Sequence, residues 1–120
     1  MSNVLNKFTA VEKDARSFGF SYPSPDLIIE QIRDECNEVL EAIQHNESTE
    51  RQQEEIGDLI HAALALCYHQ GFDIPETIDK ATNKFDTRMQ RLKAITKEEG
   101  LSSLHNQPLS YLIKLWKKAK

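Results

Sequence analysis

The sequence predicts an all-α fold, and three observations support this prediction. Apolar residues recur at three- and four-residue spacing through most of the chain, as they do on one face of a helix. Alternating apolar and polar runs and Asn-Gly turns, which indicate strands and hairpins, are nearly absent. Residues that start and stop helices separate the apolar segments. With 120 residues, the chain has the size of one small domain, so long helices would share part of their core with a second copy.

The first helix is expected over roughly residues 2–17. Its apolar face carries Val4, Phe8 and Val11. Gly19 is the natural stop, because glycine readily adopts the left-handed backbone that ends helices. Residues 20–25 contain two prolines and are expected to form a loop.

The second and third helices are expected to follow each other closely. The second opens with Ser24 as its cap and Pro25 in its first turn, and it continues to about residue 45. The third begins near residues 48–49 and ends at Gly71. A short connection of this kind makes the two helices antiparallel neighbours.

The fourth helix is expected to open with a capping box that runs from Asp73 to Glu76, and to continue through about residue 94. Gly100 and two serines then interrupt the chain. A short fifth helix should start near Pro108. It carries Leu109, Leu112, Ile113, Leu115 and Trp116, followed by a basic tail of Lys117, Lys118 and Lys120.

The composition narrows the class of protein. Hydrophobic residues make up 39% and charged residues 28%, which is typical of a soluble globular chain. The net charge of −4 disfavours generic nucleic-acid binding. The first residues show no basic segment followed by an apolar run, so we expect no secretion signal. The longest strongly apolar stretch, residues 59–67, is too short to span a membrane. Cys36 and Cys67 fall at apolar helical positions and are expected to be reduced core residues. We therefore expect a cytoplasmic protein that binds neither nucleic acid nor membranes.

Two acidic pairs on consecutive helices are the strongest functional feature. Glu35 and Glu38 are one turn apart on the second helix, and Glu55 and Asp58 are one turn apart on the third. The third helix is apolar around nearly its whole circumference, so an ionised carboxylate there is costly unless it is protonated, paired or bound to a metal. Neighbouring helices pack roughly 8–10 Å apart, which lets the pairs converge. An all-oxygen ligand set suits Mg²⁺, for which Mn²⁺ can substitute. The alternative is a pair of solvated acidic helix faces.

The fourth helix carries a stripe of cations on a flank away from its apolar side. They are Lys80, Lys84, Arg88 and Arg91, with Asn83 beside them. Lysine and arginine are the usual phosphate contacts in proteins. The stripe alone is better explained as an ordinary solvated basic face. Together with an acidic cluster suited to a metal ion, it suggests a triphosphate ligand.

These motifs together resemble the MazG-type nucleotide pyrophosphohydrolases. The family pattern is ExxE, then ExxD, then a Lys-Phe-x-x-Arg segment. The matching residues are Asp34-Glu35-Cys-Asn-Glu38, Glu54-Glu55-Ile-Gly-Asp58 and Asn83-Lys84-Phe85-Asp-Thr-Arg88. The resemblance covers about residues 20–95 of what we expect to be one MazG-like helical domain, residues 1–120. Position 34 departs from the doubled Glu of the first motif, but it points outward on the helix wheel.

The resemblance implies a fold and an activity. Antiparallel helices would form a four-helix-bundle core completed by oligomerisation, as a homodimer or a dimer-of-dimers tetramer. The enzyme would use Mg²⁺ to cleave a nucleoside triphosphate, more specifically a deoxynucleotide, to the monophosphate and pyrophosphate, in nucleotide-pool house-cleaning.

The resemblance also assigns residues. Glu35, Glu38, Glu55 and Asp58 would be the metal ligands, and Lys84, Arg88 and Asn83 would contact the substrate phosphates. We assign Glu38 the catalytic role of orienting or deprotonating the attacking water. The aromatic residues before the second helix are candidates for stacking on the base. They are Phe18, Phe20 and Tyr22.

Three alternatives remain open. The first is a phosphoribosyl-ATP pyrophosphohydrolase-like enzyme, which uses a similar bundle and similar acids. The second is a ferritin-like di-iron bundle, suggested by Asp58 and His61 three residues apart, although only one such pair exists. The third is a non-catalytic helical interaction module, with the amphipathic C-terminal helix and its Trp116 as the docking element.

Overall fold

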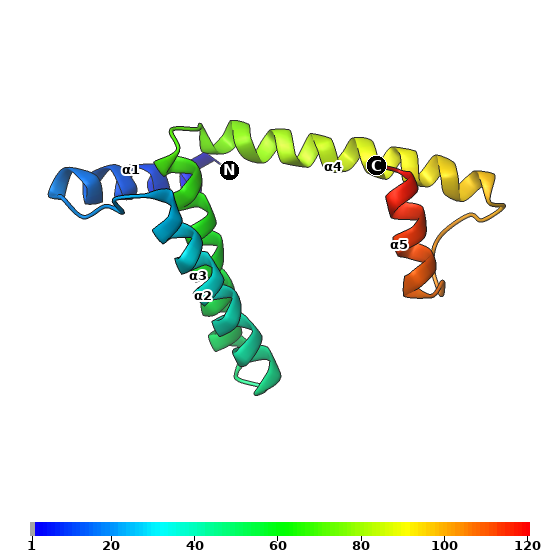
Figure 1. The fold of residues 1–120 in the computed structure, drawn as a ribbon, viewed down its shortest axis with the longest axis horizontal. Coiled ribbons are helices and arrows are strands. Elements are labelled where there is room, and N and C mark those ends of the chain that lie inside the picture. The colour runs from blue at the N-terminus through cyan, green and yellow to red at the C-terminus, as the bar shows by residue number, and fades with distance from the viewer. Residues whose placement is uncertain (1) are drawn as a thin grey trace. The chain divides into compact units, whose positions relative to one another are not determined.

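A computed structural model describes residues 2–120 and contains five helices over that range, without any strand. Figure 1 shows them in chain order. They are α1 (Ser2–Phe18), α2 (Pro25–Gln44), α3 (Thr49–His69), α4 (Ile74–Glu98) and α5 (Leu109–Lys118). The predicted all-α fold is therefore confirmed. The bounds agree with the predicted ones to within one or two residues, except that α4 ends at Glu98 rather than near residue 94.

The chain divides into two compact units. The first ends at Thr77 and the second begins at Ile78, so the boundary lies within α4. The first unit holds α1, α2, α3 and the first turn of α4. The second holds the remainder of α4 together with α5.

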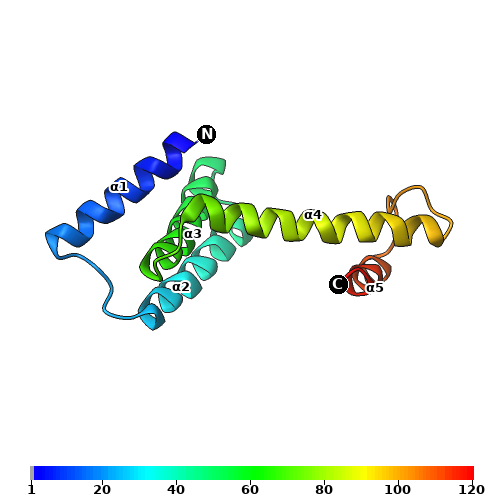
Figure 2. The same ribbon diagram turned by 90° about the horizontal axis from the view of Figure 1, so that it is seen from above.

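The helix pair α2 and α3 forms the centre of the first unit, and the two helices run side by side in both Figure 1 and Figure 2. Their buried apolar residues are few and mostly small. They are Ile28 and Ala42 on α2, and Ala62 and Ala65 on α3. Small side chains let two helices approach closely. A tight connection, in which Asn46 adopts a φ of +50°, joins the helices and makes them antiparallel, as predicted.

Helix α1 contacts α3 through a narrow strip. The rings of Phe8 and His61 meet edge to face with centroids 4.8 Å apart, and Glu12 Oε1 lies 3.0 Å from His61 Nε2. Farther along, the Arg16 guanidinium lies 4.7 Å from the centre of the Tyr68 ring. The predicted apolar face of α1 is partly wrong, because its two valines are mainly exposed. They are Val4 and Val11.

The helix ends show which predicted caps form. Ser48 accepts a hydrogen bond from the backbone N–H of Arg51 at 3.2 Å, and Asp73 accepts one from the N–H of Glu76 at 3.0 Å. Both are the predicted caps. Ser24 stands at the N-cap of α2, but its side chain makes no capping bond within the described residues. Gly71, with a φ of +81°, follows α3 as predicted.

The second unit is held by the packing of α5 on the last turns of α4. Leu92, Leu115 and Ala119 are buried there, with Met89, Ile95 and Trp116 packed around them. Leu115 is fully buried. The amphipathic character predicted for the fifth helix thus serves a contact within this unit.

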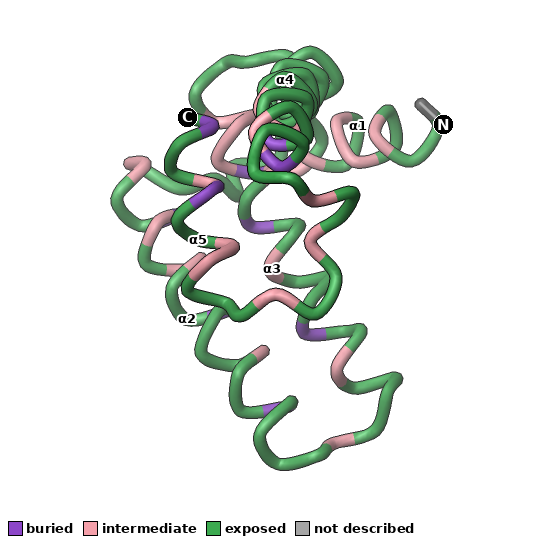
Figure 3. Tube along the Cα trace, turned by 90° about the vertical axis from the view of Figure 1, so that its right-hand side faces the viewer, coloured by how far each residue is buried: buried purple, intermediate pink, exposed green. Residues whose placement is uncertain are grey.

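Several large apolar side chains of α2 and α3 remain uncovered in the single chain. They are Leu40, Ile43, Ile56 and Ile60, which are 41% to 54% exposed. Figure 3 shows how few positions along these helices are buried.

Cys36 is also exposed, so its prediction as a core residue is wrong for the single chain. Cys67 is half-buried, and neither cysteine forms a disulfide. A four-helix core completed by a second copy stays a prediction. None of the helices in residues 2–120 could span a membrane by length and hydropathy.

Candidate metal centre

Three carboxylates from α2 and α3 meet in the first unit. Glu35 comes from α2, and Glu55 and Asp58 come from α3; one oxygen of each lies within 4.8 Å of one oxygen of both others. Glu35 is 7% exposed and Glu55 is 4% exposed, whereas Asp58 reaches solvent. We call these three residues the acidic cluster. The structure therefore brings together one member of the first predicted pair and both members of the second.

The heptad spacing of α2 and α3 places the two glutamates at core positions. On α2 the buried residues are Ile28, Glu35 and Ala42, each seven residues after the last. On α3, Glu55 precedes the buried Ala62 by the same interval. Residues seven apart lie on one side of a helix, two turns away from each other. Each glutamate thus occupies a place in the α2–α3 interface where an apolar residue would ordinarily stand.

This placement leaves the buried carboxylates incompletely satisfied. Oε2 of Glu35 and Oε2 of Glu55 are buried and have no hydrogen-bond partner among the described residues. Burial raises the pKa of the Glu55 carboxyl; Arg51 opposes this rise, and the nearby Glu38 and Asp58 carboxyls add to it. Buried polar atoms without partners are rare in folded proteins because they cost stability. A hard divalent cation, which takes carboxylate oxygens as ligands, fits this donor set.

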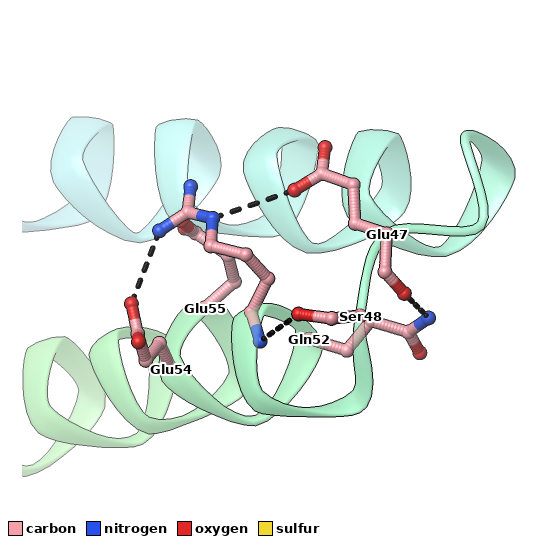
Figure 4. A network of polar contacts seen from close by, with 6 residues as sticks. Glu47, Ser48, Gln52, Glu54 and Glu55 are labelled. Carbon is pink, nitrogen blue, oxygen red and sulfur yellow. Dashed lines mark hydrogen bonds and ion pairs between the residues drawn. The ribbon is translucent and has the colours of Figure 1, made fainter.

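The other oxygen of each buried glutamate is held by a neighbour on its own helix. Gln31 Nε2 donates to Glu35 Oε1 at 2.6 Å. Arg51 Nη2 pairs with Glu55 Oε1 at 2.5 Å. The remaining nitrogens of the Arg51 guanidinium contact Glu47 at 3.4 Å and Glu54 at 3.2 Å, as the network in Figure 4 shows.

Glu38 lies outside the acidic cluster defined above but close to it. Its side chain is exposed, and its carboxyl acts on the pKa of Glu55. It stands one turn after Glu35 on α2, as the spacing predicted. Its assignments as a metal ligand and as the catalytic residue stay predictions.

A cavity of about 420 Å³ opens beside the acidic cluster. Glu35 and Asp58 line it at one place, and the loop residues Phe20 and Tyr22 line it at another. Phe18 is 88% exposed and is absent from the described lining. The base-stacking role of all three aromatic residues stays a prediction, and only Phe20 and Tyr22 line the cavity beside the cluster.

The cavity also contains polar residues that the sequence reasoning did not assign to the site. They are Glu12, Arg16, Gln31, His61 and His69. His69 Nε2 lies 3.2 Å from the backbone oxygen of Tyr22, which fixes the loop against α3. These residues come from α1, α2 and α3, and no short motif links them. Only the packing of α1 against α3 brings Glu12 and Arg16 to the cavity.

The predicted phosphate-binding residues belong to the second unit. Asn83 Nδ2 donates to Asp79 Oδ2 at 3.4 Å, and Lys84 is exposed. Arg88 Nη2 donates to the backbone oxygen of Trp116 at 2.7 Å, and its guanidinium lies 3.9 Å from the centre of the Trp116 ring. Within this unit Arg88 thus joins α4 to α5. The phosphate-binding role of Asn83, Lys84 and Arg88 stays a prediction.

Comparisons with known proteins agree with the motif pattern. The model of the MazG nucleotide pyrophosphohydrolase domain matches residues 23–93. The chain is 30% identical over 117 residues to a nucleoside triphosphate pyrophosphohydrolase/pyrophosphatase MazG of Thermotoga maritima. It is 26% identical over 118 residues to a nucleoside triphosphate pyrophosphohydrolase of Escherichia coli K12. Each alignment covers 98% of this chain but only 44% of the relative, so the chain spans less than half the length of these relatives.

Proposed function

Since the chain belongs to the MazG nucleotide pyrophosphohydrolase family, we propose that it is an enzyme that hydrolyses nucleoside triphosphates to nucleoside monophosphates and pyrophosphate. The observation that carries this proposal is the acidic cluster. Two glutamates buried between α2 and α3 each keep one oxygen without a hydrogen-bond partner in the described chain, next to the exposed Asp58. Such groups lower the stability of the fold, so packing alone does not explain their presence in the core. The family model spans both compact units, so we treat residues 1–120 as one MazG-like domain.

The donor set favours Mg²⁺, with Mn²⁺ as a substitute, because all the candidate ligands are carboxylate oxygens. Glu35, Glu55 and Asp58 would hold the cation, with Glu38 as a further ligand. The bound cation would neutralise charge on the triphosphate during cleavage.

The remaining roles fall to side chains of this chain. Glu38 orients the water that attacks the α-phosphorus and takes its proton. The bond between the α-phosphorus and the bridging oxygen breaks, and pyrophosphate leaves. Lys84 and Arg88 stabilise the charge that develops on pyrophosphate, and Asn83 contacts the substrate.

The cavity supports a nucleotide as the substrate. It contains aromatic rings from Phe20 and Tyr22 together with Glu35 and Asp58, so a base and a cation-bound phosphate would both find suitable partners. We propose a deoxynucleotide substrate and a role in cleansing the cytoplasmic nucleotide pool.

We propose further that the active form is a homodimer or a dimer-of-dimers tetramer. The exposed side chains of Leu40, Ile43, Ile56 and Ile60 support this assembly, because helices of a four-helix core bury such residues.

A substrate panel tests the function directly. The purified chain is incubated with canonical and oxidised nucleoside and deoxynucleoside triphosphates, and with phosphoribosyl-ATP, each with Mg²⁺ or with EDTA. We expect monophosphate and pyrophosphate in equal amounts, only with Mg²⁺, and a preference for a deoxynucleotide. Release of inorganic phosphate and a diphosphate would contradict the proposed bond cleavage. Turnover of phosphoribosyl-ATP alone would favour the phosphoribosyl-ATP pyrophosphohydrolase alternative.

A further inference from the structure

Each buried glutamate of the acidic cluster is held by a side chain one helical turn before it. Gln31 holds Oε1 of Glu35 on α2, and Arg51 holds Oε1 of Glu55 on α3. We propose that Gln31 and Arg51 are positioning residues for the cation site, and that each fixes one oxygen of its glutamate so that the other oxygen is presented to the ion. This inference rests on the proposed function, because it requires a divalent cation at the cluster.

The distribution of hydrogen bonds supports a role in positioning rather than in packing alone. A carboxylate can accept several hydrogen bonds through both of its oxygens. In both Glu35 and Glu55 the donor reaches only Oε1, while Oε2 is buried and receives no donor in the described part of the chain. The Glu38 carboxyl can share a hydrogen bond with Glu55 only if one of the two carries a proton. A partner that served the stability of the fold alone would gain most by satisfying both oxygens.

The same arrangement occurs at both acidic pairs, Glu35/Glu38 on α2 and Glu55/Asp58 on α3. Gln31 precedes Glu35 by four residues, and Arg51 precedes Glu55 by four residues. Side chains four residues apart lie over one another on a helix, so each donor approaches its carboxylate from the side of the preceding turn. Hydrogen bonds from outside a metal site orient the ligands, and their loss weakens metal binding.

The two donors differ in charge and in surroundings. Gln31 is neutral and half-buried, and it lines the cavity beside Glu35. Arg51 is a cation with a side chain that is 52% exposed, and it also contacts Glu47 and Glu54. Its positive charge repels a bound cation while its hydrogen bond positions Glu55. Gln31 therefore gives the cleaner test, because its replacement changes no charge.

The test measures Mn²⁺ affinity of the full chain by electron paramagnetic resonance of the free ion. We expect Gln31→Met to bind Mn²⁺ about 10- to 100-fold more weakly than the wild type. Gln53→Met, which changes an exposed glutamine on α3, is the matched control and should bind within about twofold of the wild type. Gln31→Asn keeps the amide but shortens its reach, and it should also bind weakly. Thermal unfolding without metal shows that each variant is folded.

The role of Arg51 is tested by comparing a variant that removes its hydrogen-bond donor with a variant that keeps one. Arg51→Met should weaken Mn²⁺ binding, by less than Gln31→Met because the repulsive charge is removed as well. Arg51→Lys, which keeps a donor for Glu55, should recover most of the affinity. Arg33→Met removes a cation from an exposed position of α2 and should leave the affinity unchanged.

The outcomes separate this inference from the proposed function. If the wild type binds Mn²⁺ and both Gln31 variants match the Gln53→Met control, the positioning role of Gln31 is wrong while the cation site stands. Affinity in Arg51→Met equal to or above that of the wild type overturns the role of Arg51. A wild type that binds no Mn²⁺ overturns the cation site and this inference together. Pyrophosphate release, assayed on the same samples, reports on the proposed hydrolysis independently.

Discussion

The acidic cluster of the first unit and the basic residues of the second unit differ in how their charges are satisfied. In the first unit, two buried carboxylates each keep one oxygen without a partner among the described residues. In the second unit, Arg88 donates twice to the backbone oxygen of Trp116 and stacks on its ring, and Lys84 is exposed to water. Buried charge without a partner is costly, whereas exposed or fully bonded charge is not. The first unit therefore carries structural evidence for a ligand, while the second unit contributes cations whose ligand role rests on the motif.

Replacing Glu55 should give the largest effect. Glu55→Gln keeps the shape but removes a charged ligand, and we expect loss of Mn²⁺ binding and a fall in turnover of at least about 10³-fold. Without metal, the same variant should unfold at a higher temperature than the wild type, because a buried, mutually repelling carboxylate is gone. Calorimetric Mn²⁺ titration, pyrophosphate release and thermal unfolding measure these three changes.

The matched control for this variant is Glu50→Gln, which changes an exposed acid in the first turn of α3. It should keep wild-type turnover and Mn²⁺ affinity. If Glu55→Gln retains full turnover, the acidic cluster is not the catalytic metal site, and the contrast between the two units loses its functional meaning.

Arg88 should give an intermediate effect that sharpens the comparison. Arg88→Lys loses the double hydrogen bond to Trp116 and most of the stacking on its ring, so we expect a loss of about 1–2 kcal/mol in the free energy of unfolding. Lys84→Met removes an exposed cation and should leave stability unchanged within about 0.5 kcal/mol. Chemical denaturation measures both.

Kinetics of the same two variants test the phosphate-binding prediction. If Lys84 and Arg88 both contact the triphosphate, both substitutions lower kcat/KM by about tenfold or more. A purely structural Arg88 would show the stability loss with kcat/KM unchanged. Unchanged kcat/KM in both variants would assign the basic stripe to an ordinary solvated face.

Much of the fold could be predicted from local chemistry. Proline and serine mark the starts of α2, α3 and α5 closely, and glycine marks the ends of α1 and α3, because caps and terminators act within one turn. The face of α1 could not be predicted in this way. Its shielded side includes Phe8 and Glu12, which contact His61 of α3. A search for apolar residues at helical spacing does not assign a charged residue such as Glu12 to the packed face.

The candidate site was predictable in its charges but not in its hydrogen bonds. The spacing of Glu55 and Asp58 within an apolar helix indicated a buried acidic pair, and the structure places both in one cluster with Glu35. Glu35 was expected at the edge of an apolar arc, yet it is almost fully buried, because the antiparallel α3 covers that edge. Gln31 and Arg51 carried no signal, since a glutamine or arginine four residues before a glutamate is common on any helix.

The smallest expected effect is a pH dependence of the metal-free chain. The pKa of Glu55 is raised by its burial, so the folded chain binds a proton there more tightly than the unfolded chain does. Above the ordinary pKa of 4.5 the unfolded chain has released this proton, while the folded chain keeps it until the raised pKa is passed. The contribution of Glu55 to stability is therefore present at low pH and is lost as the pH rises through that window.

Urea unfolding in EDTA at pH values from about 5 to 8 measures this dependence. The wild type should lose stability with rising pH relative to Glu55→Gln, which has no proton to release at this position. Saturating Mg²⁺ should abolish the difference in slope, because a cation then takes the place of the proton at the buried carboxylate. Parallel pH profiles for the two proteins in EDTA would show that Glu55 is as well solvated as the exposed acids. The acidic cluster would then no longer differ from the basic residues of the second unit in lacking hydrogen-bond partners.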